Sequence, residues 1–363
     1  MISTKYRSKK RSESHNLRDV CHAMPETVCP KCNQPIEFSK SGKNQCDSCL
    51  MSFPVVAGMV DLRLQSDRYL SLNQERQKAR RLAEKESSLS LEALARAYYS
   101  ITADVDEDRR ERFVRHILQA ENRGFALLSC LPEIGNILEI GCGTGGFLAA
   151  AAKSGRNAIG IDIASRWLVV ARRRLRDVFK YNNNSAMIPA CAENLPYRDN
   201  SWDLIVADSL LEHVDDSVAV IREMVRVISP GGLILIWTPN RRWPGPDPHV
   251  GLWLVKFLPK EWAKKYLNSR RGNIFRPECR SDLEWESLLK LHFPNLQIDC
   301  LPADTSGWPK CDKTLRGHLI RLIGRLGRLP FFKFLLQSYG PLMELRIRKP
   351  YYFINENQIS GLE

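Results

Sequence analysis

The chain has 363 residues, which exceeds one average domain, so we expect a main domain with smaller appendages. Its composition, 44% hydrophobic and 26% charged, is ordinary for a globular protein. No uncharged apolar run reaches the roughly 18–20 residues that a membrane-spanning helix needs, and the polar, basic N-terminus is unlike a secretory signal. We therefore expect a cytoplasmic protein.

The formal net charge of +13 favours an acidic partner, either nucleic acid or an anionic membrane surface, although solubility alone would also explain it. The positive excess is concentrated in two segments. Between Cys311 and Pro350 there are nine Lys or Arg and two Asp or Glu, and a second basic run occupies residues 5–11.

The pattern along the chain predicts four regions. Residues 1–24 form a basic polar tail that we expect to be disordered, and residues 25–64 form a compact cysteine-rich module. Residues 65–130 are expected to be a helical linker or cap, because Gln74–Ser87 is rich in strong helix formers. Residues 131–363 form the main domain, with a lid over 239–280 and a basic amphipathic insertion over 312–345.

Two close cysteine pairs, Cys29 with Cys32 and Cys46 with Cys49, dominate the first module. Each pair has the Cys-X-X-Cys spacing of a zinc knuckle, and 13 residues separate the two pairs. Four thiolates satisfy a tetrahedral Zn²⁺ and leave no open coordination position, so we predict a structural zinc ion. Two unrelated, redox-active pairs are the alternative, and the paired spacing disfavours it.

The segment after the second pair, Phe53–Leu62, resembles the strand that follows the ribbon in a bacterial zinc-ribbon family fused to methyltransferases. One such fusion is the ribosomal-RNA guanine methyltransferase family. The resemblance supports zinc and says little about the substrate.

Short apolar runs alternate with helical segments from Asn136 onward. The runs predict strands over Ile137–Ile140, Ala158–Asp162, Met187–Ala190, Leu204–Ala207 and Leu233–Trp237. Helices are predicted between them over Phe147–Ser154, Ser165–Val178 and Val218–Ile228. This alternation predicts an α/β fold, a doubly wound and mostly parallel sheet with helices on both faces.

A glycine-rich loop, Gly141-Cys-Gly-Thr-Gly-Gly146, follows the first predicted strand. Its glycines let the backbone turn sharply and let a ligand approach closely, but they also fit the dinucleotide pattern GxGxxG. Glu139 separates the two, because its carboxylate would repel a pyrophosphate and attract the ammonium and sulfonium of S-adenosylmethionine (SAM). Asp162, about 20 residues further on, can accept both ribose hydroxyls.

With the loop Cys191–Tyr197 and the strand that follows it, the stretch Asn136–Asn240 resembles the class I SAM-dependent methyltransferases, and closely the subgroup acting on quinones, sterols and other small acceptors. The resemblance implies a Rossmann-like sheet of seven strands, with SAM as the cofactor. The glycine loop would wrap its amino-acid end, the second-strand acid would hold the ribose, and residues 192–193 would flank the adenine. The implied cofactor-binding residues are Glu139, Gly141, Cys142, Gly143, Gly145, Asp162, Ile163, Ala192, Glu193 and Asp208.

His213 follows the fourth predicted strand, at the edge of the sheet where ligands bind in such folds. Methyl transfer from a sulfonium is an in-line displacement that mainly needs alignment of the reacting atoms. A hydroxyl acceptor must also lose its proton, and a histidine suits that role near neutral pH. His213 is therefore the candidate base; alternatively it only packs or hydrogen-bonds within its loop.

Four prolines between Thr238 and Pro248 exclude regular structure and predict a defined lid over the active site. We expect Trp243, His249 and Trp253 to line the acceptor pocket, the alternative being a surface loop stiffened by proline. The run from Pro248 to Trp253 resembles one in bacterial methyltransferases of surface-glycan and lipid pathways.

After the lid we expect a helix over Asp282–His292, a strand over Leu296–Cys300 and, as is usual in the family, a final antiparallel strand over Arg348–Ile354. The stretch between the two strands would then be an insertion.

Within this insertion, leucines spaced three or four residues apart from Leu315 to Leu329 share one helical face. Arg321, Arg325 and Arg328 share an adjacent face, and a run of phenylalanines follows. A basic helix backed by such residues can lie in an anionic membrane interface. In the alternative, the leucines pack on the domain and the arginines face water.

Three hypotheses follow. The first is an enzyme that methylates a small, lipid-linked or saccharide acceptor, with peripheral contact to an anionic membrane at its inner face. The second is a methyltransferase for ribosomal- or transfer-RNA bases that docks phosphates with its ribbon and tail; against it, Asp208–Leu211 lacks the Asn/Asp-Pro-Pro-aromatic tetrad of many exocyclic-amine enzymes. The third is a non-catalytic scaffold, disfavoured by the intact glycines and carboxylates.

Overall fold

The computed structural model describes residues 26–36, 44–102, 107–133, 135–178, 187–247, 252–271, 278–307 and 315–351. The predicted N-terminal tail, residues 37–43 between the two cysteine pairs and His249 lie outside these ranges. Within them, no helix combines the length and the apolar character required to cross a membrane.

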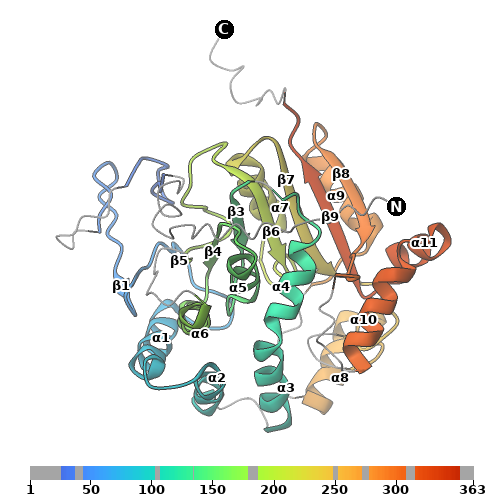
Figure 1. Ribbon diagram of the computed structural model, residues 1–363, viewed down its shortest axis with the longest axis horizontal. Helices are drawn as coiled ribbons and strands as arrows, with labels where there is room; N and C mark the ends of the chain where they lie inside the picture. The colour runs from blue at the N-terminus through green and yellow to red at the C-terminus, as the bar shows by residue number, and fades with distance from the viewer. Residues whose placement is uncertain are drawn as a thin grey trace, which may run out of the picture.

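A seven-stranded sheet with the order β5-β4-β3-β6-β7-β9-β8 forms the centre of the structure (Figure 1). Its strands are β3 (Ile137–Ile140), β4 (Ala158–Asp162), β5 (Met187–Pro189), β6 (Trp202–Asp208), β7 (Ile228–Pro239), β8 (Gln297–Pro302) and β9 (Leu342–Arg348). Neighbours are parallel, except that β9 runs antiparallel to both β7 and β8. The predicted doubly wound sheet is confirmed. Its chain order reverses between β3 and β6, which is where such sheets bind ligands.

Alternate residues of the strands enter two separate cores, one on each face of the sheet. In β7, Leu233 and Leu235 belong to the first core, whereas Ile234 and Ile236 belong to the second. Helices α5 (Gly146–Lys153) and α6 (Ser165–Val178) bury apolar residues in the first core, and α7 (Ser217–Val227) and α9 (Asp282–His292) do so in the second. Both faces are therefore covered, as the continuous apolar strands require.

Four helices precede the sheet and join the first core, which confirms the helical content predicted for this region. They are α1 (Leu72–Glu86), α2 (Leu91–Ser100), α3 (Glu107–Leu118) and α4 (Ala120–Leu128). A capping box of Ser71 and Gln74 begins α1 by satisfying N–H groups that the helix itself leaves open. Buried ion pairs join Glu75 and Glu86 of α1 to arginines of α6. They fix α1 to a helix that itself packs on the sheet.

The last strand of the described residues, β9, begins six residues before the strand predicted over Arg348–Ile354 and shares only Arg348 with it. That prediction is therefore wrong. In β9, Met343, Leu345 and Ile347 alternate into the second core, and this register is what sheet pairing selects. The prediction placed the aromatic run beyond Pro350 in the strand. Its first residue, Tyr351, is instead 80% exposed.

Four further helical elements of the described residues follow β7 or lie between β8 and β9. A short turn of 3₁₀ helix, η3 (Val255–Phe257), and α8 (Lys260–Arg271) follow β7, and α10 (Leu315–Leu326) and α11 (Pro330–Tyr339) lie between β8 and β9. In Figure 1 the orange-red α10 and α11 project at one edge of the molecule, beyond the end of the sheet.

Candidate active site

A cavity of about 590 Å³ opens where β3, β4 and β6 end. Its volume lies in the range of small-molecule and cofactor sites. Six of the ten predicted cofactor-binding residues line it: Gly141, Gly143, Asp162, Ile163, Ala192 and Glu193. Three separate stretches of the sequence thus meet around one cavity, as the order of the strands requires.

The glycine loop makes the sharp turn that its sequence predicts. Gly141 has a φ of +77° and Gly145, which begins α5, has a φ of +71°, both in the left-handed region that glycine tolerates. A Cβ on Gly145 would lie 2.9 Å from the Cβ of Ala171, so a side chain there would push α5 away from α6. The loop therefore brings bare backbone to the cavity.

Asp162 joins the end of β4 to the glycine loop. Its Oδ2 accepts a hydrogen bond from the N–H of Gly143, and its Oδ1 accepts one from the N–H of Ala164, each at 2.7 Å. Burial outweighs these bonds and raises the pKa of Asp162 to about 6. A carboxylate oxygen accepts more than one hydrogen bond, so both oxygens keep capacity for a pair of hydroxyl donors.

Glu139 is buried within β3 beneath the loop and is not among the described residues that line the cavity. Burial, together with the nearby Asp208 and Asp162, raises the pKa of Glu139 well above its usual range. Its Oε2 has no hydrogen-bond partner within the described structure. A buried carboxyl in this state fits a cationic group close by, such as the ammonium of SAM.

The other predicted cofactor residues stand slightly back from the cavity. Cys142 is buried against Gly160, and Asp208 forms a two-pronged ion pair with Arg123 of α4. Arg123 also donates to Ser209 at 3.0 Å. Sequence reasoning missed this arginine, because it lies 85 residues from its partner and its helix carries no motif.

His213 lines the cavity from the turn after β6. Its N–H donates to the carbonyl of Leu210 at 2.8 Å, which closes the turn, while its neighbour Glu212 is buried on the other side, within 3.4 Å of Thr238 Oγ1. The imidazole and the carboxylate of this Glu-His pair therefore face different environments. The position of His213 fits the predicted base, and its role stays a prediction.

Another part of the cavity wall comes from residues that sequence reasoning did not single out. One part is the strap, which we define as residues Asp61–Tyr69, and the other part is the helices α2 and α3. The helices contribute Tyr98, Tyr99, Phe113 and His116, so their part of the wall is largely aromatic. The only signal in the sequence was the amphipathic spacing of α2, which does not reveal where the helix packs.

Two of the three residues predicted for the acceptor pocket lie elsewhere. Trp243 packs beside Gly245 and Trp253 is 61% exposed, and neither is among the described residues that line the cavity. His249 lies outside the described residues.

The four predicted zinc ligands form a cluster. The Sγ atoms of Cys29, Cys32, Cys46 and Cys49 all lie within 4.8 Å of one another, and two of the distances are 3.6 Å. A tetrahedron with Zn–S bonds of about 2.3 Å puts its sulfurs about 3.8 Å apart, whereas a disulfide needs about 2.05 Å. The residue after each pair, Asn33 or Leu50, adopts a left-handed φ that turns the chain back. The donor set and its spacing fit one zinc ion.

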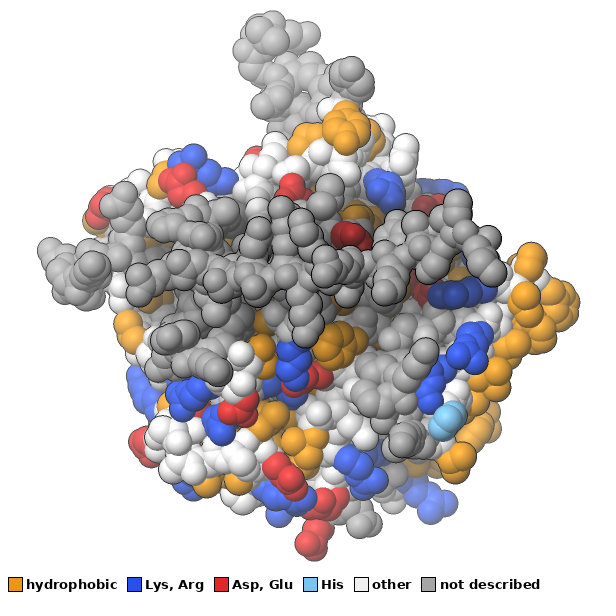
Figure 2. All heavy atoms as spheres, viewed as in Figure 1, with side chains coloured by type: hydrophobic (Ala, Val, Ile, Leu, Met, Phe, Trp, Pro, Cys, Tyr) orange, Lys and Arg blue, Asp and Glu red, His pale blue; other side chains and the backbone are white. Residues whose placement is uncertain are grey.

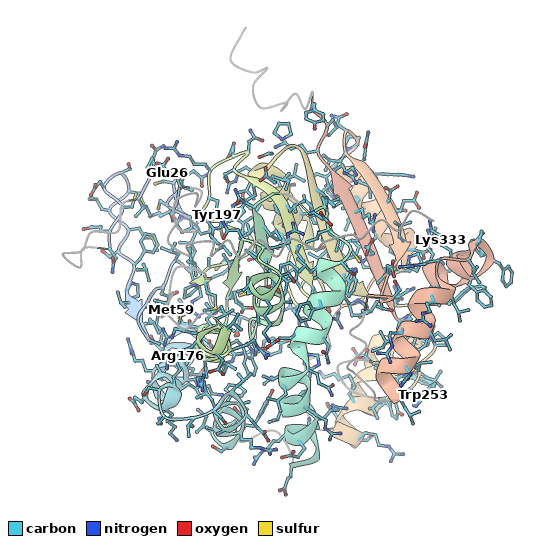
Figure 3. The ribbon with its side chains drawn as sticks, in the orientation of Figure 1. Glu26, Met59, Arg176, Tyr197, Trp253 and Lys333 are labelled. Carbon is cyan, nitrogen blue, oxygen red and sulfur yellow. The ribbon has the colours of Figure 1, made fainter. Side chains whose placement is uncertain are left out.

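The cysteine cluster is packed onto the sheet. Cys29, Cys46 and Phe53 belong to the second core, and Thr27 pairs with Tyr197 in an isolated β-bridge. Figure 3 labels Tyr197 and Glu26, which lie close together between the cysteine-rich module and the sheet, and an ion pair joins Glu26 to Arg198. The module thus contacts the loop that carries Ala192 and Glu193.

Comparison with known proteins agrees with this geometry. A family model described as a methyltransferase domain matches residues 138–236. A ubiquinone biosynthesis O-methyltransferase from Nitrosospira multiformis is 32% identical over 180 residues, covering 47% of this chain and 72% of that protein. A demethylmenaquinone methyltransferase from Staphylococcus saprophyticus is 31% identical over 161 residues, covering 44% of this chain and 63% of its own length.

For several relatives the match is shorter. The chain spans 44% of the length of a ubiquinone biosynthesis O-methyltransferase from Pseudomonas aeruginosa, at 35% identity and over 29% of this chain. Among solved structures, a phosphoethanolamine N-methyltransferase from Haemonchus contortus with bound SAM aligns at a TM-score of 0.38 and 17% identity, covering 63% of this chain and 52% of that one.

Proposed function

The chain belongs to the class I SAM-dependent methyltransferases, and from this premise we propose that it transfers the methyl group of SAM to a hydroxyl group of a small, lipid-linked acceptor. One observation carries the proposal: the glycine loop, Asp162, His213 and the aromatic side chains of α2 and α3 line a single cavity. The glycine loop and Asp162 suit the cofactor. His213 and the aromatic side chains suit an acceptor with a ring and a hydroxyl.

When bound, SAM supplies a methyl group made electrophilic by its sulfonium. We assign the ribose hydroxyls to Asp162 and the cationic amino-acid end to the backbone of the glycine loop, above the buried carboxyl of Glu139. Ala192 and Glu193 would flank the adenine. Each assignment is supported by the position of the residue at or just behind the cavity wall.

His213 would act as the general base for the acceptor. As the acceptor oxygen forms its bond to the methyl carbon, the C–S bond breaks and its electron pair stays on sulfur, while the hydroxyl proton passes to the imidazole. Such a base contributes typically 10²–10⁴-fold to a rate, on the order of what an unactivated hydroxyl needs. Relatives named for O-, N- and quinone methylation share the domain, so the choice of a hydroxyl rests on His213.

We further propose that the four-cysteine cluster holds a structural zinc ion. Four thiolates close the coordination shell, so the ion would take no part in the reaction. Because the cluster lies in the second core and its module contacts the loop after β5, its role would be to fix that side of the cofactor site.

The acceptor's lipid link is inferred from the surface of α10 and α11. Several of their apolar side chains point outward instead of packing on the domain. The exposed fractions are 91% for Leu315, 56% for Leu319, 52% for Leu322, 69% for Phe331 and 67% for Phe334. Figure 2 shows these side chains as an orange band along the edge where Figure 1 places the two helices. An exposed apolar patch of this kind marks an interaction surface.

The charge of the same segment supports an anionic membrane as the proposed partner. Residues 315–339 contain five Lys or Arg and no Asp or Glu. Arg325 and Lys333 are exposed beside the apolar band, where blue side chains adjoin it in Figure 2. Arg321, by contrast, is only 9% exposed and is not available for lipid headgroups. Apolar residues flanked by cations are the composition of an interfacial helix.

A methyltransferase for RNA bases is the second candidate function. The net charge of +13 favours it, but the basic run that would hold phosphates lies outside the described residues. The cavity is largely walled by apolar and aromatic side chains, which suits a small acceptor better than an RNA strand.

The central test follows the methyl group. The purified, zinc-loaded protein is incubated with SAM carrying a radioactive methyl group and, separately, with total lipid and total RNA from a strain that lacks the gene. We expect label in the lipid fraction, and we expect His213→Gln to lower its rate about a hundredfold or more. Label in RNA alone would replace this proposal by the RNA function, and no label in either fraction would refute both.

The membrane contact is tested by flotation with vesicles of phosphatidylcholine, with or without 30% phosphatidylglycerol as the anionic lipid, a composition chosen for the experiment. We expect binding only to anionic vesicles, and we expect Phe331→Ser with Phe334→Ser to abolish it. Leu291→Ser is the matched control, because Leu291 is 76% exposed on α9, outside the band. Unchanged binding of the double variant would refute the assignment of this surface.

A further inference from the structure

The strap connects the cysteine-rich module to α1 and crosses the ends of three sheet strands. Its Leu62 N–H donates to the carbonyl of Pro189 in β5 at 2.9 Å, and Arg63 Nη1 donates to the carbonyl of Ile163 beyond β4 at 2.7 Å. At its other end, Arg68 forms an ion pair with Asp215, beyond β6. Residues 65–69 line the cavity. The strap therefore lies across the mouth of the proposed active site.

The strap is held in place by buried charges. Asp61 and Arg63 are joined by hydrogen bonds of 2.6 and 2.8 Å, and neither side chain is exposed. Arg76 of α1 donates to Asp61 at 2.9 Å as well. Breaking such a buried network leaves an uncompensated charge, which costs several kcal/mol. This end of the strap is accordingly a fixed anchor.

The backbone at Tyr69 is fixed by Asp67. The Oδ1 of Asp67 accepts hydrogen bonds from the N–H groups of Tyr69, at 2.9 Å, and Leu70, at 2.5 Å, while its Oδ2 pairs with Arg166 at 3.1 Å. These contacts set the direction of the Tyr69 side chain before any ligand binds. Its phenolic oxygen lies 2.9 Å from Nδ1 of His213.

We propose that Tyr69 is a positioning residue for His213, and this inference rests on the proposed hydroxyl methylation. The 2.9 Å contact allows either group to donate; in the arrangement proposed, the Nδ1–H of His213 donates to the phenolic oxygen, which leaves the lone pair of the neutral imidazole on Nε2. Nε2 is then the nitrogen that accepts the acceptor's proton. The imidazolium formed keeps its Nδ1–H on Tyr69 and does not turn away.

A kinetic test uses Tyr69→Phe, which removes only the phenolic oxygen. The ring is 47% exposed, so the substitution leaves the cores intact. With the labelled lipid assay we expect kcat to fall about tenfold, the value of one hydrogen bond, while the KM for SAM stays unchanged. The matched control is Tyr351→Phe, at an 80% exposed tyrosine away from the cavity. An unchanged kcat in Tyr69→Phe would overturn the inference.

A spectroscopic test does not depend on the acceptor. Nitrogen-15 NMR of the histidine rings, in protein saturated with S-adenosylhomocysteine (SAH), reports which nitrogen carries the proton. We expect His213 to be protonated on Nδ1 in the parent protein and to exchange between both forms in Tyr69→Phe, while His116 on the cavity's other wall keeps its signal. A proton on Nε2 of His213 in the parent protein would refute the inference, whereas failure of the parent protein to bind SAH would refute the proposed function.

Discussion

The N–H of Val28 donates a hydrogen bond to the carbonyl of Pro196 at 3.0 Å. This bond joins the residue just before the first zinc-ligand pair to the loop after β5, four residues or fewer from Ala192 and Glu193. The cysteine-rich module and the adenine side of the proposed cofactor site therefore share one piece of backbone. If the cysteine cluster becomes disordered, this shared backbone should transmit the change to the cofactor site.

Loss of zinc should weaken cofactor binding as well as stability. Cys46→Ser removes one buried thiolate ligand, and structural zinc contributes on the order of 10 kcal/mol to small zinc modules. We expect the variant to lose its metal, to melt at a lower temperature and to bind SAH at least tenfold more weakly. Metal analysis, thermal unfolding and calorimetry measure the three effects.

Cys300→Ser is the control for this experiment, because Cys300 lies in β8, outside the cluster. It should keep its zinc and its affinity for SAH. Full SAH affinity in metal-free Cys46→Ser would show that the two sites are independent.

Asp162→Ala should weaken SAM binding about a hundredfold. The substitution removes the acceptor for two ribose hydroxyls, and hydrogen bonds to a charged group are worth roughly 1.5–3 kcal/mol each. It also removes the acceptor of the hydrogen bond that the N–H of Gly143, in the glycine loop, donates to Asp162. Calorimetry with SAH measures the change, and circular dichroism verifies that the fold persists. An unchanged affinity would exclude Asp162 from the ribose site.

Cofactor affinity should fall below pH 6. Because burial raises the pKa of Asp162 to about 6, the carboxyl takes up a proton there and loses its capacity to accept both hydroxyls. Each unit of pH below this value should cost up to about tenfold in SAH affinity. Asp162→Asn should lack this component, so the two proteins are compared by calorimetry at pH 5 and pH 7.5.

In the unliganded protein, pH should affect stability in the opposite direction: a lower pH should stabilise the fold through Asp162. A folded-state pKa raised above the ordinary value of 3.8 means that the folded protein binds this proton more tightly than the unfolded chain. The contribution of Asp162 to stability is then fully present below pH 4 and is lost as the pH rises through 6. Urea unfolding of the parent protein and of Asp162→Asn across that range isolates it.

The parts of the fold that local sequence determines were predicted well. The ranges predicted for β3, β4, α6 and α9 agree with the structure, because apolar runs, the glycine loop and helix periodicity are all properties of neighbouring residues. The cysteine cluster was likewise predicted from spacing alone, since the geometry of the metal site restricts where each pair can lie.

The part of the cavity wall formed by the strap, α2 and α3 was not predictable in this way. Tyr69 and His213 are 144 residues apart, and neither motif nor periodicity connects them. The position of Trp253 was not predictable for a related reason: prolines show that a segment is irregular, but not which way it faces, and Trp253 is directed to the surface. Contacts that depend on tertiary packing are absent from any short window of sequence.

Glu75→Gln should destabilise the protein by about 3 kcal/mol, because it leaves the buried Arg166 with less compensating charge. The side chains of this pair are 2% and 8% exposed, and Arg166 N–H also donates to Glu75 at 2.9 Å. Urea unfolding measures the loss. Glu92→Gln removes a helix ion pair with Arg96 whose side chains are about half exposed, so water already screens it and no measurable change is expected. Equal effects of the two substitutions would show that burial does not strengthen the contact between α1 and α6, and that the N-terminal helices are held by their apolar faces alone.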